Sequence, residues 1–232
     1  MAVGLGHQAR MQANRDESTR VAAALAERFI QVVRDSRPQV VLDVGAWDGR
    51  LAKACVTAAP DAAVHAFEAN PYVYDHKAPR LIGTGVNYHH LAVGAEVGEA
   101  TFSVVRHFKG MDASPKAGSN SMRRRLLDNV EYEDFQVPMI TIDAFASEHD
   151  LLGRSCALWM DLEGCAYEGL TGAPRMLETT HVVMVEVEAR QLWVGQKTAD
   201  DVEALLNSFA FVQVGRDQQY GDQYNVLYAR AV

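Results

Sequence analysis

Hydrophobic residues along the chain follow two spacings, one typical of amphipathic helices and one typical of buried strands. In residues 16–35 they recur every three or four positions, which predicts a helix that ends before Pro38. Short runs rich in β-branched residues follow and predict strands at 40–45, 63–68, 86–90, 100–106, 136–140, 156–161, 181–188, 211–214 and 224–229. Further helices are expected at about 48–58, after Pro71, and at 141–148, 167–178 and 198–209.

This alternation of strand and helix predicts an α/β fold. The near-continuous apolar run at 182–185 is typical of a parallel strand that is covered on both faces. We therefore expect a Rossmann-like, mostly parallel seven-stranded sheet with helices on both faces and an antiparallel hairpin at one edge. Residues 1–38 are predicted to be an N-terminal helical extension, and residues 39–232 a single domain. The polar, Gly/Ser-rich stretch 107–134 shows no periodicity, which predicts a long functional loop.

The charge, the cysteine spacing and the length of the apolar runs argue against several classes of function. The net charge of -8 argues against a general nucleic-acid binder, which needs clustered Lys and Arg. The three cysteines form no C-x-x-C pair, so neither a zinc site nor a redox dithiol is indicated. No apolar run has the length of a signal peptide core or of a membrane-spanning helix. We expect a cytoplasmic protein without nucleic-acid or membrane partners; the pattern does not predict an oligomeric state.

A glycine turn follows the first predicted strand, in the sequence Asp43-Val44-Gly45-Ala46-Trp47-Asp48-Gly49. In an open α/β sheet, ligands bind beyond the carboxyl ends of the strands. A dinucleotide fingerprint would need glycine at positions 47 and 50, where Trp47 and Arg50 stand. The acid-x-Gly-x-x-x-Gly pattern instead favours S-adenosylmethionine, with Asp43 near the methionine ammonium and the Gly45 region beside the methionine moiety.

Glu68 ends the second predicted strand, 25 residues after Asp43. A carboxylate at this place can accept hydrogen bonds from both hydroxyl groups of a ribose. Asp43 and Glu68 could also simply cap the helices that follow them. Because the glycine turn and the acid occur together, each at the end of a predicted strand, a ligand site is the favoured interpretation.

Three segments resemble the FkbM-type methyltransferases: 41–46, Phe67-Glu68-Ala69-Asn70-Pro71 and Asp161-Leu162-Glu163-Gly164. The resemblance extends from about Val40 to Phe211, although Ala69 replaces a usual proline and Trp159 a frequent lysine. It implies a class I methyltransferase that uses S-adenosylmethionine for O-methylation of a small molecule or sugar. The cofactor-binding residues expected from the turn, the spaced acid and this resemblance are Asp43, Gly45, Ala46, Trp47, Gly49, Glu68, Ala69, Asn70, Ala92 and Asp161.

Acidic residues at the ends of two later strands are the candidates for catalysis. Asp161 is predicted to lie beside the transferred methyl group, and Glu186 to act as the general base. Asp161 and Glu186 could instead bind a hard cation such as Mg²⁺. Glu163 and Glu188 are expected to have structural roles. His107, at the start of the long loop, is a further candidate base.

Basic and aromatic residues suggest where an acceptor could bind. Arg123, in the run 123–125, could hold a phosphate or carboxylate, although a solvated loop explains the run equally. Arg190 and Trp193 combine a donor with an aromatic plate that suits a sugar-like acceptor, and Trp193 could also pack beneath the following helix. Residues 119–121 are expected to close over the adenosine.

Three alternatives to O-methylation remain from the residues alone. The first is an N-methyltransferase on the same scaffold, because no residue distinguishes amine from alcohol acceptors. The second is a nucleotide-dependent dehydrogenase or epimerase, for which the second and third glycines are missing. The third is a domain that binds the cofactor without turnover.

Overall fold

A computed structural model describes the backbone of residues 2–218 and 221–231, with side chains from residue 17 onward within these ranges. Its centre is a seven-stranded sheet in the order β10-β11-β9-β8-β1-β2-β3. The strands are β1 (Val40–Val44), β2 (Ala63–Phe67), β3 (Val86–His89), β8 (Cys156–Met160), β9 (Thr180–Glu188), β10 (Phe211–Arg216) and β11 (Gln223–Arg230). The helices are α1 (Ala2–Ser36), α2 (Arg50–Ala58), α3 (Pro71–Leu81), α4 (Ile142–Glu148), α5 (Ala166–Thr171), α6 (Pro174–Thr179) and α7 (Ala199–Ser208).

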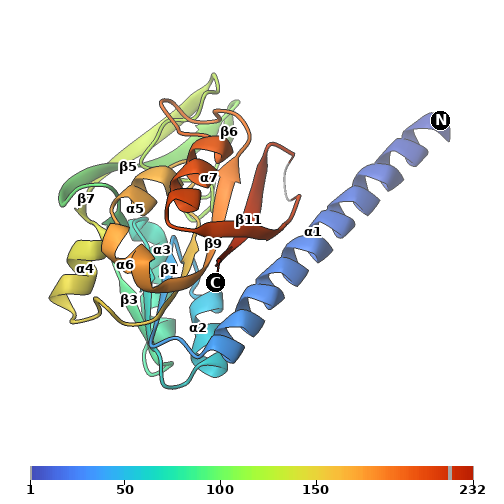
Figure 1. The fold of residues 1–232 in the computed structure, drawn as a ribbon. Coiled ribbons are helices and arrows are strands. Elements are labelled where there is room, and N and C mark those ends of the chain that lie inside the picture. The colour runs from blue at the N-terminus through green and yellow to red at the C-terminus, as the bar shows by residue number, and fades with distance from the viewer. Residues whose placement is uncertain (1, 219–220, 232) are drawn as a thin grey trace.

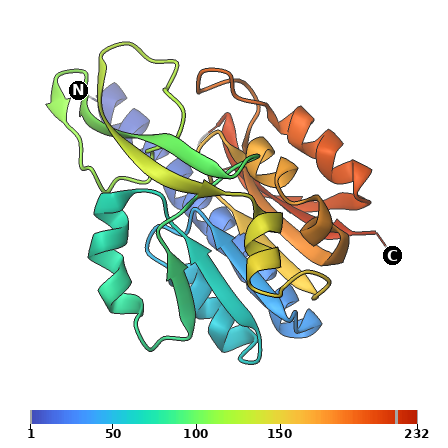
Figure 2. The ribbon, with the colours of Figure 1, turned by 90° about the vertical axis from the view of Figure 1, so that its left-hand side faces the viewer.

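The predicted fold class is confirmed. Strands β9, β8, β1, β2 and β3 pair in parallel, whereas β11 is antiparallel to β9 and to β10 at one edge. Helices cover both faces of this sheet, as Figures 1 and 2 show. Parallel pairing brings the carboxyl ends of β1, β2 and β8 to the same edge, where ligands bind in open α/β sheets.

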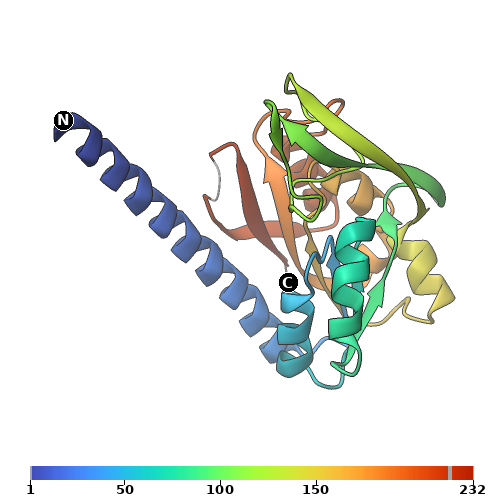
Figure 3. The ribbon, with the colours of Figure 1, turned by 180° about the vertical axis from the view of Figure 1, so that it is seen from behind.

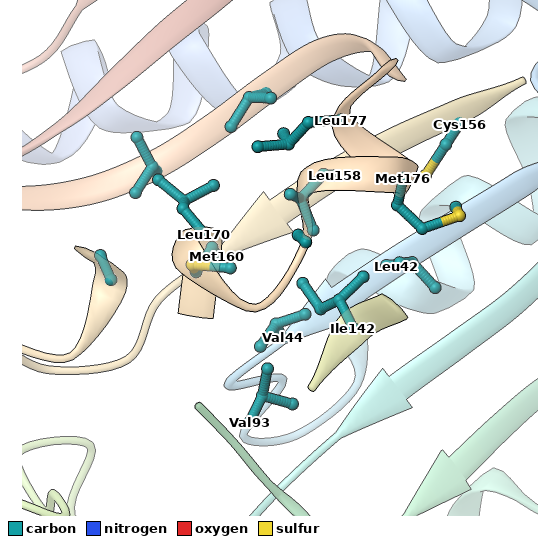
Figure 4. Packing of buried hydrophobic residues seen from close by; sticks show 14 of the residues in the cluster. Leu42, Val44, Val93, Ile142, Cys156, Leu158, Met160, Leu170, Met176 and Leu177 are labelled. Atoms are coloured by element: carbon teal, nitrogen blue, oxygen red, sulfur yellow. The ribbon is translucent and has the colours of Figure 1, made fainter. Parts of the chain in front are cut away.

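Alternate residues of each central strand enter two separate cores. Leu42, Val44, Leu158 and Met160 point to one side, where they pack with Ile142 and other residues of α4–α7 (Figure 4). On the opposite side, a second cluster joins the sheet to α1 and α2; its strand residues are Val41, Val64, Ala66, Ala157, Val182, Met184 and Leu227. Because both faces are buried, these strands are apolar at nearly every position.

The predicted N-terminal helix is longer than its hydrophobic repeat indicates, because α1 begins at Ala2. Its C-terminal part carries Leu25, Phe29 and Val33 into the core that it shares with α2. Figures 1 and 3 show the other end projecting away from the sheet. No helix in the described part of the chain combines the length and the apolar character needed to cross a bilayer.

The prediction for residues 107–134 is wrong in part, because this region contributes to a second sheet in the order β4-β7-β5-β6. Strand β5 (Gly98–Phe108) continues past Arg106, β6 covers Met111–Asp112, and β7 (Val130–Ile140) begins six residues before the predicted 136; β4 (Ala92–Val93) completes the sheet. The two long strands pair in antiparallel fashion, so their polar outer faces meet solvent while Phe102, Val104 and Val137 form a small core. Irregular chain remains between β6 and β7.

The single helix predicted for 167–178 is also wrong, since the structure has α5 and α6 separated at Gly172–Ala173. Pro174 lacks an N–H group, so it is accommodated in the first turn of α6 rather than inside a continuous helix. Predicted ends of the other elements shift by a few residues.

Candidate functional site

The turn after β1 packs directly onto the end of β8. Gly45 has a φ angle of +82°, and its N–H donates to the carbonyl of Phe67 at 3.0 Å. A Cβ atom at this position would lie 1.7 Å from the main-chain oxygen of Asp161. Only glycine therefore fits here, both for backbone conformation and for space.

Asp43 is buried under this turn. Its Oδ2 accepts a hydrogen bond from the N–H of Ala52 in α2, at 3.1 Å, so it connects the strand to the helix. Burial, together with the charges of Asp161 and Glu68, raises the pKa of Asp43 to about 7. Of the residues predicted to bind the cofactor through this turn, Gly45 and Trp47 line the cavity beside it, whereas Asp43, Ala46 and Gly49 are not among the lining residues.

Glu68 lies at the carboxyl end of β2 and faces the same cavity. Its Oε1 accepts from the N–H of Asn70 at 2.7 Å, and Asn70 in turn caps α3 by accepting from Tyr72. Burial raises the pKa of Glu68 to about 7, against the lowering effect of the hydrogen bonds from Asn70 and Trp47. Asn70 therefore caps α3, whereas Glu68 lines the cavity and does not cap this helix.

A cavity of about 470 Å³ connects these groups, within the range of small-molecule sites. It lies between the carboxyl ends of β1, β2 and β8 and the second sheet. The predicted cofactor residues that line it are Gly45, Trp47, Glu68, Ala69, Asn70, Ala92 and Asp161, and Glu186 joins them. Ser119 and Asn120, two of the residues expected to close over the site, line it as well.

Carboxylates gather at the inner end of this cavity. Oxygen atoms of Asp161, Glu163 and Glu186 lie within 4.8 Å of one another, and Asp161 and Glu186 hydrogen-bond to each other. Burial raises the pKa of both, which favours a protonated carboxyl group in this pair. A divalent cation is the other occupant that such a triad of oxygens could hold.

Two side chains that are not among the lining residues of the cavity contact these carboxylates. Nε2 of Gln223 in β11 donates to Glu186 at 2.8 Å and to Glu163 at 3.1 Å. Arg125 lies 3.6 Å from Glu163. Glu188 is withdrawn from the cavity and accepts from the side chain of Gln196. Glu163 is predicted to have only a structural role, but this residue lines the cavity.

His107 lies in β5, not at the start of a loop over the cavity. Its imidazole contacts the carboxylates of Asp112 and Glu131, at 2.8 and 3.2 Å. It is not among the residues that line the cavity. The prediction of His107 as a base therefore lacks the necessary proximity, because the strand continues through this residue and turns it toward its cross-strand neighbours.

The run Arg123–Arg125 is neither a solvated loop nor an open anion site. Arg123 donates to Glu168 and to the carbonyl of Val194, both at 2.8 Å. Arg124 pairs with Asp134, and Arg125 lies over the ring of Trp193 at 4.6 Å. These arginines instead connect the loop to neighbouring segments.

The two remaining acceptor candidates are also placed differently from the prediction. Trp193 is 0% exposed, and it packs against Gly164 as well as Arg125. It therefore presents no aromatic plate to a ligand. Arg190 is exposed and pairs with Asp222.

Sequence reasoning missed the apolar wall that the second sheet supplies. Phe102 of β5 and Met122, between β6 and β7, line the cavity together with Val73 of α3. The alternating pattern of 100–106 is a signal for the strand, but nothing in that pattern indicates that its Phe102 faces the strand ends of another sheet.

Comparison with known proteins agrees with this geometry. Residues 43–223 match the methyltransferase FkbM domain, which is well over half of the chain. The structure is similar to the FkbM methyltransferase of Methylobacillus flagellatus KT, with a TM-score of 0.51 and 13% identity over 83% of this chain. The match covers 44% of that chain, so the present chain spans less than half of its length. No curated protein matches.

Two further structures have lower TM-scores. Magnesium protoporphyrin IX methyltransferase from Synechocystis PCC 6803, solved with S-adenosylmethionine, has a TM-score of 0.48 and 10% identity, over 91% of this chain and 79% of that one. A Burkholderia thailandensis 1,6-didemethyltoxoflavin-N1-methyltransferase, solved with its substrate and S-adenosylhomocysteine, has a TM-score of 0.45 and 17% identity, over 99% and 85%. From the match over residues 43–223 and the fold, the chain belongs to the family of FkbM methyltransferase domains.

Proposed function

We propose that this protein transfers the methyl group of S-adenosylmethionine to a hydroxyl group of a small molecule or sugar. The observation that carries this proposal is the cavity that joins the Gly45 turn, Glu68 and Asp161 at the carboxyl ends of three parallel strands. Family membership supports the same methyl donor.

Each part of the cavity suits one part of the donor. Glu68 accepts hydrogen bonds from the ribose hydroxyls through the acceptor capacity that its carboxylate retains beside its bonds to backbone N–H groups. Gly45 and Trp47 adjoin the methionine moiety, with Asp43 and Ala46 holding the turn and Gly49 the start of α2. Ala69, Asn70 and Ala92 contribute the wall around the adenosine. When it is bound there, S-adenosylmethionine supplies a methyl group on a positively charged sulfur.

The carboxylates at the inner end suit an alcohol as acceptor. A hydroxyl group must lose a proton as its oxygen bonds to the methyl carbon and the carbon–sulfur bond breaks. Glu186 takes this proton in its deprotonated form, in which its raised pKa makes it a stronger base than an ordinary carboxylate, and Asp161 orients the hydroxyl. The residues themselves thus provide a base, and we assign no step to a metal ion.

The charges around the cavity favour an acceptor without phosphate or carboxylate groups near the reacting atom. The charged side chains among its described lining residues are Glu68, Asp161, Glu163 and Glu186, all acidic. Anionic acceptors, including nucleic acids, would find no Lys or Arg among these lining residues to neutralise their charge. Arg123, the predicted anion site, is not among the residues that line this cavity.

The test is formation of S-adenosylhomocysteine from S-adenosylmethionine in the presence of matched polyhydroxy and amino compounds. We expect turnover with a hydroxyl acceptor, and a loss of kcat of about 100-fold or more in Glu186→Gln with little change in donor affinity. Turnover restricted to amine acceptors would contradict O-methylation. Unchanged kcat in Glu186→Gln would contradict the role of that residue.

A further inference from the structure

Residues 113–120 form a roof over part of the cavity. This irregular segment follows β6, and Ala117, Gly118, Ser119 and Asn120 line the cavity. Its ends are joined to β5, through hydrogen bonds from Ala113 to Arg106 and between Ser103 and the adjacent Ser121. In Figure 1 the second sheet, which carries this segment, lies above the main sheet.

The middle of the roof is held to the main-sheet turns through two of its main-chain carbonyl groups. Nδ2 of Asn70 donates to the carbonyl of Pro115 at 2.8 Å, and Nε1 of Trp47 donates to the carbonyl of Lys116 at 3.0 Å. Asn120, within the segment, donates to Pro115 and Ala117 at 3.0 and 2.9 Å, which keeps the roof itself folded.

Asn70 connects this roof to the carboxylate beneath it. The residue is 2% exposed and uses three groups in three directions. Its N–H donates to Glu68, its Oδ1 accepts from Tyr72 at the start of α3, and its Nδ2 reaches the roof. A single buried residue therefore contacts both the Glu68 carboxylate and the Pro115 carbonyl of the roof.

We propose that Asn70 and Trp47 are positioning residues that hold the 113–120 roof closed over the bound methyl donor. The inference rests on the proposed function for the identity of that ligand. Because the roof lines the cavity and these two side chains hold it there, its release from them would widen the path by which the donor or its product leaves. Both side chains therefore control the dissociation rate of the ligand.

Two substitutions remove the contacts while they preserve the rest of each residue's role. Asn70→Ser keeps an oxygen that can cap α3 but loses the donor to Pro115. Trp47→Phe keeps the aromatic ring but loses the donor to Lys116. Asn87→Ser is the matched control, because Nδ2 of Asn87 also donates to a main-chain carbonyl, that of Val64, at 3.1 Å within the β2–β3 pair.

The experiment measures the dissociation rate of S-adenosylhomocysteine and, by mass spectrometry, trypsin cleavage after the exposed Lys116 in the full chain. We expect each of the two variants to dissociate roughly fivefold faster, as expected for one lost hydrogen bond, and to be cut faster at Lys116. Asn87→Ser should match the wild type in both measurements. A merely structural role would lower the thermal midpoint without changing these two rates.

Unchanged dissociation and cleavage rates in both variants would overturn the proposal. If the wild type did not bind S-adenosylhomocysteine, the proposed function would fail. Cleavage at Lys116 in the ligand-free variants would then still decide whether the two side chains hold the roof.

Discussion

The backbone of Gly45 lies against the main-chain carbonyl of Asp161, so the turn after β1 and the end of β8 form one continuous wall of the cavity. The N–H of Asp161 donates to the carbonyl of Val44 at 2.8 Å, which keeps the two segments in register. A Cβ at Gly45 would overlap the Asp161 oxygen at 1.7 Å. Gly45 and Asp161, which both line the cavity, are therefore positioned by each other.

Gly45→Ala should destabilise the protein by about 3 kcal/mol or more, from steric overlap and from the strained φ angle together. Gly83→Ala is the matched control, since Gly83 has a φ of +74° but no atom within 4 Å of the place that a Cβ would occupy. The control should lose only about 1 kcal/mol. Urea unfolding of both variants measures the difference. Equal losses would show that contact with Asp161 contributes nothing.

The helix α1 should behave as part of the folded domain through its C-terminal half. Phe29 is 0% exposed and meets the ring of Trp159 edge-on, with centroids 5.3 Å apart. Phe29→Ala should lower the free energy of unfolding by about 3–5 kcal/mol, whereas Glu27→Ala on the exposed side should change it by less than about 0.5 kcal/mol. A small loss in Phe29→Ala would mean that the helix packs only loosely on the sheet.

The central strands and their polar ends could be predicted from the sequence because a buried parallel strand has a simple signature. Residues 40–44 and 182–185 are largely apolar on both faces, and glycine or acid follows where the strand leaves the core. Local sequence carries all of this information. It is therefore sufficient to assign Gly45, Glu68 and Asp161 to one edge of one sheet.

The second sheet and the acceptor side could not be predicted in the same way, since their stabilising partners come from distant segments. In β7, Glu133 and Asp134 look unfavourable for a strand until Arg106 and Arg124 are placed beside them. Trp193 resembles an exposed ligand plate until Arg125, 68 residues earlier, covers it. Such pairings follow from the tertiary fold.

Through Glu163, the stability of the ligand-free protein should fall as pH rises from about 4.5 to 8. Burial beside Asp161 raises the pKa of Glu163 to about 8, far above its usual 4.5 in an unfolded chain. Between these two pH values the folded state binds a proton that the unfolded state has lost, so this contribution to stability declines steadily and is gone above pH 8. Glu163→Gln should flatten the pH dependence of the urea midpoint. An equally steep profile in that variant would contradict the assignment.

The buried pair of His65 and His89 should give stability a pH dependence of opposite sign in the acid range. Nδ1 of His65 and Nε2 of His89 lie 3.1 Å apart, and burial lowers the pKa of both to about 4. The unfolded chain takes up protons below about 6.5 while the folded chain does not, so the contribution of this pair to stability should decline between pH 6.5 and 4, in opposition to that of the buried carboxyl groups. His65→Phe should weaken this decline when unfolding is followed by circular dichroism. Its persistence at full steepness would assign it to other groups.

The central claim, that this cavity binds S-adenosylmethionine through Glu68, is tested most directly by calorimetric titration with S-adenosylhomocysteine, with NAD as the control ligand. We predict micromolar binding of S-adenosylhomocysteine, no detectable binding of NAD, and a loss of affinity of about tenfold or more in Glu68→Gln, which keeps the acceptor for Asn70 but loses the charge. Binding of NAD in place of S-adenosylhomocysteine, or equal affinity in Glu68→Gln, would contradict the account.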